Sequence, residues 1–235
     1  KVMLNGHNTR LILQNPDDIK VLLLPKNIEK DKIRLIRGAG VDTNNFFYKR
    51  LSKDSFTVIL PSRMLWSKGI EDFKKCSKIL FTKTKNIKFI LVGKPDMHNP
   101  DSIPLELLHK WAESQNFEYI GYKKEMVKIF HECSLVCLPT SYGEGLPKSL
   151  LEAASCGRPI IAYNVPGCRE VVRHGHNGLL VEKRNVNALA DAIYTLYKDY
   201  KLCVKMGQSG RKLVENNFTV KKIANQTHDV WEELF

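Results

Sequence analysis

Two carboxylates stand eight positions apart in the stretch PTSYGEGLPKSLLEAASCG, which covers residues 139–157. They are Glu144 and Glu152, and glycines flank the first of them at Gly143 and Gly145. Glycines beside a charged group let the backbone approach a ligand closely, so this pair is a candidate binding site. An isolated pair of glutamates is more often ordinary: Glu144 could favour a helix dipole, and Glu152 could be a solvated helix position.

A second candidate pair is cationic and lies upstream, in SRMLWSKG. Arg63 offers a planar fork of N–H donors and Lys68 a compact charge, and both suit phosphate. Both follow the apolar run at 56–60, so they lie in a loop at the carboxyl end of a predicted strand, where open α/β sheets bind ligands. The simpler alternative for Lys68 is the start of a solvated helix.

A predicted strand, a glycine loop and a helix position the two glutamates. The apolar run at 135–138 indicates a buried strand. Pro147 suits the first turn of a helix, which Gly157 then stops. Glu144 therefore lies in the loop and Glu152 inside the helix, whose N-terminus offers unpaired N–H groups to a phosphate.

Strands alternate with helices along most of the chain. Strands are expected at 56–60, 88–92, 117–120, 134–138, 159–162 and 179–181, and helices at 69–83, 103–114, 124–131, 169–173, 186–199, 202–215 and 220–235. This alternation predicts an α/β, Rossmann-like fold with a mostly parallel sheet and helices on both faces. Before it, short strands are expected at 11–13 and 33–36, a helix from 16 to about 24, and a loop or linker at 37–45.

Composition argues against several function classes. The shares of hydrophobic (43%) and charged (26%) residues describe an ordinary globular protein, and no apolar run reaches the ~20 residues that span a bilayer. The net charge is +12, but no nucleic-acid signature accompanies it, so we expect no nucleic-acid partner. The opening KVMLNGHNTR does not resemble a signal peptide, and the six cysteines are expected to be the reduced thiols of a cytoplasmic protein.

Cysteine and histidine spacing predicts no metal site. The six cysteines are scattered through predicted elements, and we expect reduced, mostly packed thiols. Cys133 and Cys137 form a C-x3-C without a second pair at zinc spacing. His174 and His176 could suggest a metal, but the Asn-Gly that follows at 177–178 favours a surface turn.

Several motifs in order resemble the family 4 (group 1) glycosyltransferases of the GT-B fold. The longest is GEGLPKSLLEAASCGRPIIAYNVPGCREVV, in which Glu144 and Glu152 match the family's E-x7-E pair. The others are RGAGVDTNNF, SRMLWSKG, LVG and NGLLV. The resemblance covers most of the chain, and the ordered set is more specific than any one motif.

The resemblance implies a retaining transferase with a nucleotide-sugar donor, most often a UDP-sugar. It implies that Arg63 and Lys68 bind the donor diphosphate, that Glu152 binds the ribose hydroxyls, and that Glu144 binds the transferred sugar. Glu144, Arg63 and Lys68 would serve catalysis without a covalent nucleophile, because the leaving phosphate helps to deprotonate the acceptor. Further expected substrate contacts are Gly93, Gly121, Tyr122, Gly143, Gly145, Leu146 and Pro147.

The sequence contains neither a D-x-D motif nor a Walker P-loop. We therefore expect a metal-independent reaction without a cofactor. Side-chain cations and helix N–H groups would neutralise the diphosphate leaving group, and such electrostatic stabilisation is usually the largest catalytic contribution.

The same resemblance divides the chain. Residues 1–45 would close an N-terminal acceptor-binding domain and cross over, and residues 46–235 would form the donor-binding domain with its C-terminal helices, so we expect part of a larger hexosyltransferase. The expected acceptor is a glycan or a polyprenyl-linked saccharide in polysaccharide biosynthesis, such as capsule or O-antigen. The positive charge favours a peripheral position at the inner face of the membrane.

Two other functions stay open. The chain could be a nucleotide-sugar binding module that contributes no catalysis by itself. It could also be a nucleotide-sugar 2-epimerase, which shares the fold and a similar donor site. The close match to GEGLPKSLLEA favours transfer over epimerisation.

Overall fold

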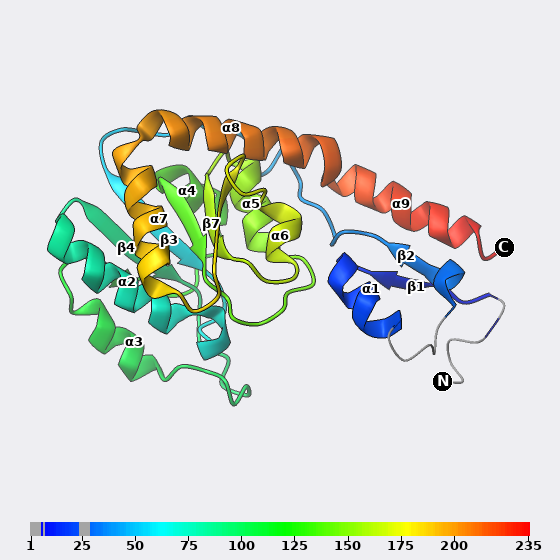
Figure 1. Ribbon diagram of the computed structural model, residues 1–235, viewed down its shortest axis with the longest axis horizontal. Helices are drawn as coiled ribbons and strands as arrows, with labels where there is room; N and C mark the ends of the chain where they lie inside the picture. Colours follow the sequence, from blue (N-terminus) through cyan, green and yellow to red (C-terminus); the bar gives the residue numbers. More distant parts are fainter. Residues whose placement is uncertain (1–5, 7, 24–28) are drawn as a thin grey trace.

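The computed structural model describes residues 6, 8–23 and 29–235, so the expected helix end near Leu24 and much of the opening segment lie outside the described residues. The described chain contains two parallel sheets, one of six strands and one of two. Figure 1 shows helices around the larger sheet, the smaller sheet standing to one side, and the C-terminal helices reaching from one to the other.

The six-stranded sheet holds most of the core. Its strands are β3 (Phe56–Pro61), β4 (Ile87–Val92), β5 (Phe117–Tyr119), β6 (Leu135–Leu138), β7 (Ile160–Tyr163) and β8 (Gly178–Val181). Every neighbouring pair is parallel, and the spatial order is β5-β4-β3-β6-β7-β8. The predicted parallel sheet is confirmed. The order reverses between β3 and β6, which makes their carboxyl ends the topological switch point of the sheet.

Helices cover both faces of this sheet, as predicted. They are α2 (Ile70–Lys83), α3 (Leu105–Ala112), α4 (Met126–Glu132), α5 (Lys148–Ser155), α6 (Cys168–Val171), α7 (Val186–Lys198) and α8 (Tyr200–Asn217), with a 3-10 turn, η3 (Trp66–Lys68), after β3. α2 packs on α7, and α5 packs on α8. Because crossovers between parallel strands are right-handed, helices that follow strands on either side of the switch point cover opposite faces.

The helix that carries Glu152 begins one residue later than expected. Pro147 has φ −66° and ψ 108°, so its ψ is extended and it occupies the N-cap position, and α5 starts at Lys148. Glu144 still lies in the loop and Glu152 inside the helix, as predicted.

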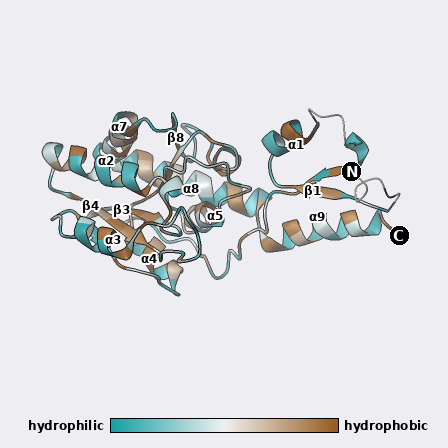
Figure 2. Ribbon diagram, turned by 90° about the horizontal axis from the view of Figure 1, so that it is seen from below, coloured by the Kyte–Doolittle hydropathy of each residue, from teal (hydrophilic) through white to brown (hydrophobic). Residues whose placement is uncertain are grey.

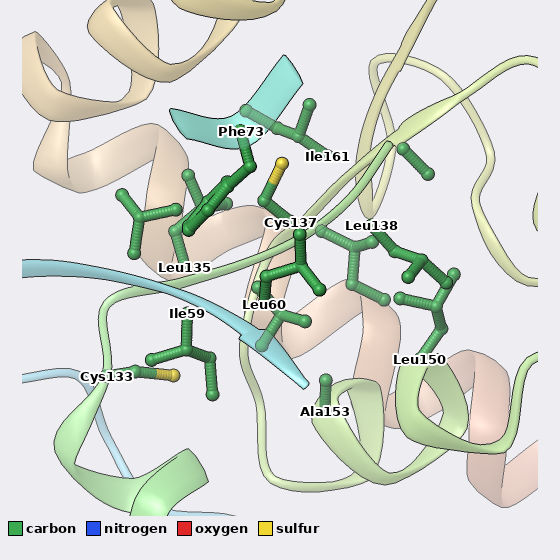
Figure 3. Packing of buried hydrophobic residues seen from close by; sticks show 14 of the residues in the cluster. Ile59, Leu60, Phe73, Cys133, Leu135, Cys137, Leu138, Leu150, Ala153 and Ile161 are labelled. Atoms are coloured by element: carbon green, nitrogen blue, oxygen red, sulfur yellow. The ribbon is translucent and has the colours of Figure 1, made fainter. Parts of the chain in front are cut away.

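β6 lies in the middle of the core. All four of its residues are buried, and the cluster around it includes Phe73 of α2 and Leu150 of α5 (Figure 3). Side chains of a strand alternate between the two faces of a sheet, so β6 contacts both layers of helices. This explains its unbroken apolar run, which is typical of a parallel strand buried on both faces.

The smaller sheet pairs β1 (Leu11–Leu13) with β2 (Ile33–Leu35), and α1 (Pro16–Leu23) and a 3-10 turn, η2 (Lys30–Lys32), lie between them in sequence. The last helix, α9 (Val220–Glu232), lies along this sheet (Figures 1 and 2). Ile36, Ile223 and Val230 form a small buried cluster there. Glu233 pairs with Arg10 at 3.0 Å and also with Arg34, which fixes the end of α9 against the sheet.

The segment after β2 and the turn between α8 and α9 both cross from one part of the fold to the other, and they run side by side. The N–H of Val41 donates to the carbonyl of Phe218 at 2.8 Å, and the N–H of Val220 donates to the carbonyl of Val41 at 3.2 Å. Gly40 has φ +73°, and a Cβ there would lie 2.9 Å from the Val220 backbone. The close approach therefore requires a glycine at this position.

The cysteines are packed inside the fold, as the sequence predicted, and the two histidines of the HGH motif lie at the surface. All six cysteines are free and buried, and burial raises the pKa of the Cys156 thiol to about 12. His174 and His176 are exposed in a turn, and the described residues contain no cluster of three or more metal-ligating side chains. None of the described helices combines the length and the apolar character that crossing a bilayer requires.

Candidate functional site

The loops after β3 and β6 meet at the switch point of the large sheet. Gly69 ends the first loop with φ +74°, and a Cβ there would lie 1.9 Å from the carbonyl oxygen of Pro139. The N–H of Ser141 donates to the carbonyl of Ser67 at 2.8 Å, and the hydroxyl of Thr140 donates to the same carbonyl at 3.2 Å. These contacts hold the two candidate motifs against each other.

Lys68 and Glu144 are brought together by these loops. The Lys68 Nζ donates to Glu144 Oε1, and each side chain is only 15% exposed. Both face a cavity of about 510 Å³, called here the Glu144 cavity, whose lining also includes Tyr142. The pair places a positive and a negative group at one wall of a space large enough for a hexose.

The backbone of the Glu144 loop is held from two other parts of the chain. The N–H of Glu144 donates to the carbonyl of Pro166 at 3.2 Å, and a Cβ on Gly167 would lie 2.3 Å from the carbonyl oxygen of Glu144. Asn15, which is fully buried, donates from Nδ2 to the carbonyls of Glu144 and Gly145 at 3.2 and 3.3 Å. The smaller sheet therefore helps to fix the loop that carries the candidate carboxylate.

Glu152 lies in a second, smaller cavity of about 270 Å³, called here the Glu152 cavity. Gly93, Tyr122 and Ser149 also line it, and Ser149 lies in the first turn of α5, so the helix N-terminus adjoins this space. The Glu152 side chain is 14% exposed, and burial raises the pKa of its carboxyl, while Lys148, 3.8 Å away, acts in the opposite direction.

Arg63 forms the shared wall of the two cavities. Its side chain is 60% exposed, and its guanidinium pairs with Asp96 at 3.0 Å. A ligand that filled both cavities would pass this guanidinium, so a phosphate at that point would meet a charged fork of donors.

Gly93 lines the Glu152 cavity, and Gly121 directly precedes Tyr122, which also lines it. Gly93 has φ +147°, and a Cβ there would lie 1.8 Å from the carbonyl oxygen of Ser62. The N–H of Gly93 donates to the carbonyl of Gly121 at 2.9 Å, which joins the ends of β4 and β5. Gly121 has φ +67° in open space, and the neighbouring Tyr122 is 65% exposed over the cavity.

The other expected substrate contacts lie in the Glu144 loop but do not line either cavity. Gly143 is exposed, and a Cβ on Gly145 would lie 2.4 Å from the side chain of Gln14. Leu146 packs against Gly38, and Pro147 is buried as the N-cap of α5. Their substrate contacts stay predictions.

Sequence reasoning missed several groups around the Glu144 cavity. Asp101 accepts from the N–H of Ser67 at 3.0 Å, which orders the η3 turn that ends at Lys68. Asn99 and Asp101 line the cavity from the segment after β4. The signal was present, because polar residues that follow a parallel strand lie at the same edge of the sheet as the motifs already found.

Known sequences place the chain in a family. Residues 41–213 match the family described as glycosyl transferases group 1. The chain is 30% identical to the N,N'-diacetylbacillosaminyl-diphospho-undecaprenol alpha-1,3-N-acetylgalactosaminyltransferase of Campylobacter jejuni, over 77% of this chain and 50% of that protein. It is 26% identical to the capsular polysaccharide biosynthesis glycosyltransferase CapM of Staphylococcus aureus, over 95% of this chain and 60% of that protein.

Solved structures share the fold. Anabaena HepE in complex with UDP-glucose superposes with a TM-score of 0.82 at 20% identity, over 98% of this chain and 66% of that chain. A glycosyltransferase from Rickettsia africae gives 0.84 at 20% identity, over all of this chain and 65% of that chain. These neighbours are GT-B glycosyltransferases, which confirms the predicted fold class. The chain spans about half the length of the Campylobacter relative and 60% of CapM. With its matched region covering most of its residues, the chain belongs to the group 1 glycosyl transferases.

Proposed function

We propose that this chain is the donor-binding part of a retaining hexosyltransferase whose donor is a nucleotide sugar of the UDP-sugar class. The observation that carries the proposal is the pair of cavities on either side of Arg63 at the switch point. One cavity is lined by Glu152, and the other by Lys68 and Glu144. The three parts of a nucleotide sugar follow the same order as these features: the nucleoside matches the Glu152 cavity, the diphosphate matches Arg63, and the hexose matches the Glu144 cavity.

The nucleoside would occupy the Glu152 cavity. A carboxylate can accept hydrogen bonds from two vicinal hydroxyls, so Glu152 would bind the ribose. The base would lie against Tyr122 and the backbone around Gly93 and Gly121, where open glycine backbone allows close approach. The buried position of Glu152 strengthens each hydrogen bond that its carboxylate accepts.

The diphosphate would lie between the cavities, against Arg63 and Lys68. As the bond to the sugar breaks, negative charge grows on the leaving phosphate, and a fixed cation stabilises that charge most strongly in a site shielded from water. Lys68 is suited to this because it is mostly buried and held in place by Glu144. We propose that these side chains, and the N-terminus of α5, neutralise the leaving group without a metal ion.

The sugar would occupy the Glu144 cavity. Glu144 is committed to Lys68 through one oxygen, and its other oxygen can accept from a sugar hydroxyl. We therefore assign it to sugar binding and orientation rather than to nucleophilic attack. The leaving phosphate would take the proton of the acceptor hydroxyl, and that hydroxyl would approach from the same face of the sugar.

We propose the acceptor class from the relatives. The Campylobacter relative is named for a diphospho-undecaprenol substrate, and CapM for capsular polysaccharide biosynthesis. For this protein we propose a glycan or polyprenyl-linked saccharide acceptor, a cytoplasmic location, and peripheral contact with the inner face of the membrane, which the net charge of +12 favours. We also propose that residues 1–45 belong to the acceptor-binding side and 46–235 to the donor-binding domain.

A calorimetric screen tests the donor proposal. UDP-glucose, UDP-galactose, UDP-N-acetylglucosamine, UDP-N-acetylgalactosamine and GDP-mannose would each be titrated into the chain, with uridine as a reference. We expect at least one UDP-sugar to bind more tightly than GDP-mannose and far more tightly than uridine. A folded chain that bound none of the nucleotide sugars would contradict the proposal.

A further inference from the structure

A third cavity, of about 460 Å³, lies outside the proposed donor site, and we call it the basic cavity. It is formed between the segment after β2, the α6 region and the start of α9, on the side of the large sheet that faces the small one (Figure 1). Its charged lining consists of Arg37, Arg169, Arg173, Lys222 and Glu170. Side-chain amides of α8 and α9 add further donors.

The carboxylates near this cavity do not balance its cations. Glu170 is paired with Arg37 at 2.6 Å, and Arg169 lies 3.4 Å from Asp17. Among the described residues, no ion pair involves the other two cations, Arg173 and Lys222. Cations from three separate parts of the chain therefore line the basic cavity, and the positive charges of Arg173 and Lys222 are not balanced by a carboxylate of the described chain.

The position of Lys222 adds to this imbalance. It lies in the first turn of α9, which contains no acidic residue, and its Nζ donates to the carbonyl of Asn216 at 2.5 Å. The N-terminal end of a helix carries a partial positive charge, which disfavours a cation and favours an anion. A bound anion would relieve the repulsion between the helix end and the lysine.

We propose that the basic cavity binds a phosphate-type anion, with diphosphate the best fit, at a site separate from the donor diphosphate. Three arginine forks and a lysine line it, and arginine and lysine are the side chains that recognise phosphate oxygens. The cavity is larger than a free diphosphate, so the bound group can be part of a larger molecule.

The cavity lies one short helix away from the Glu144 loop. Gly167, just before α6, packs against the Glu144 backbone, and Arg173 lies just beyond the other end of α6. Four helical residues rise about 6 Å. If the proposed function holds, a diphosphate attached to the acceptor saccharide could reach the basic cavity while the saccharide lies near Glu144. The same chemistry could also come from free diphosphate.

Titration with inorganic pyrophosphate at low salt tests the site itself. The chain would be saturated with UDP, so that the donor site is filled, and Arg173→Gln and Lys222→Gln would be compared with the wild type. We expect each variant to bind pyrophosphate about tenfold to hundredfold more weakly, the effect of one lost charge-assisted hydrogen bond. Lys201→Gln removes an exposed charge of α8 outside this cavity and should change nothing.

The variants separate this inference from the donor proposal. Arg63→Gln should weaken UDP and leave the UDP-insensitive pyrophosphate site intact, whereas Arg173→Gln should do the reverse. Pyrophosphate binding that UDP abolishes completely, or that neither Arg173→Gln nor Lys222→Gln weakens in folded protein, would overturn the basic site. Melting curves of the variants should match the wild type, because both side chains are exposed.

A second ligand distinguishes the two sources of the anion. Farnesyl diphosphate would be titrated into the same UDP-saturated proteins. Tighter binding than pyrophosphate, lost in Arg173→Gln, assigns the site to the diphosphate of a lipid-linked acceptor. Binding no tighter than pyrophosphate, with the same dependence on Arg173, assigns it to a free anion.

Discussion

Lys68 donates a hydrogen bond to Glu144, although 76 positions separate them in the sequence. The contact exists because one residue follows β3 and the other follows β6, and these strands are neighbours at the switch point. Each side chain balances the charge of the other in a poorly exposed place. A donor diphosphate that reached Lys68 would therefore meet an ammonium group that Glu144 already holds in position.

The cations flanking the cavities should recognise phosphate rather than nucleoside. Arg63→Ala is expected to weaken UDP by about 1.5–3 kcal/mol, roughly tenfold to hundredfold, and to leave uridine nearly unchanged. Arg63 is mostly exposed, so its removal should not affect folding. Calorimetry with both ligands measures the difference, and Arg50→Ala, an exposed arginine outside both cavities, is the control. Equal losses of UDP and uridine would contradict the phosphate role.

Lys68→Ala should also weaken UDP more than uridine, and in addition it should lower the stability of the protein. The substitution leaves Glu144 largely buried without its cation, and an unpaired buried charge is strongly destabilising. The thermal midpoint should therefore fall for Lys68→Ala and stay unchanged for Arg63→Ala.

The fold could be predicted from the sequence because its signals are local. Apolar runs, helical spacing and the stops at glycine and proline set the elements, and alternation of strands and helices set the parallel sheet. The motifs could also be placed at the carboxyl edge, since that follows from strand direction alone. The Lys68–Glu144 pair could not, because it depends on which strands are neighbours.

The contact of Asn15 with the Glu144 loop was also out of reach. Asn15 directly precedes the helix predicted from residue 16, and its side chain accepts from the N–H of Asp18 at 2.8 Å, as an N-cap residue does. Its amide donates at the same time to two carbonyls about 130 positions away. No local pattern distinguishes a cap residue that also bridges two sheets from one that does not.

Gly69 should be required for the meeting of the two loops. In Gly69→Ala the new Cβ would collide with the carbonyl of Pro139, and the positive φ would add strain of about 1–2 kcal/mol. Gly175→Ala is the matched control, because Gly175 has φ +75° but open space around it. Chemical denaturation should show the greater loss for Gly69→Ala, by roughly 1–3 kcal/mol of overpacking. Equal losses would mean that the loops move apart without cost.

Glu152 should give nucleotide binding a dependence on pH. Burial raises the pKa of its carboxyl, so it takes up a proton at a higher pH than an ordinary glutamate. Ribose hydroxyls donate to the carboxylate form, so binding favours loss of that proton, and affinity should fall as the pH is lowered through this pKa. The ratio of wild-type to Glu152→Gln affinity for UDP, measured from pH 8 to pH 4, isolates this effect from titration of the phosphate. A ratio that stays constant would contradict it.

The two glutamates should separate by ligand. Glu152 lines the proposed nucleoside cavity, so Glu152→Gln should weaken UDP and the UDP-sugar alike, by about 1.5–3 kcal/mol for a lost charged hydrogen bond. Glu144 lines only the proposed sugar cavity, so Glu144→Gln should leave UDP binding nearly intact. Its effect should appear in the discrimination between UDP-sugars that differ at one hydroxyl, because the amide has one uncharged acceptor oxygen where the carboxylate has two, and its NH2 group can only donate.

Glu71→Gln is the control for both substitutions. Glu71 forms an ion pair with Lys75 one helical turn away, as Glu152 does with Lys148, but on an exposed face of α2 outside both cavities. Its loss should change no affinity. If UDP binding were lost in Glu144→Gln and kept in Glu152→Gln, the two roles would be reversed. If all three variants bound UDP and every UDP-sugar like the wild type, Glu144 and Glu152 would have only structural roles, at the start of α5 and in the contact with Lys68. The donor would then have to bind elsewhere.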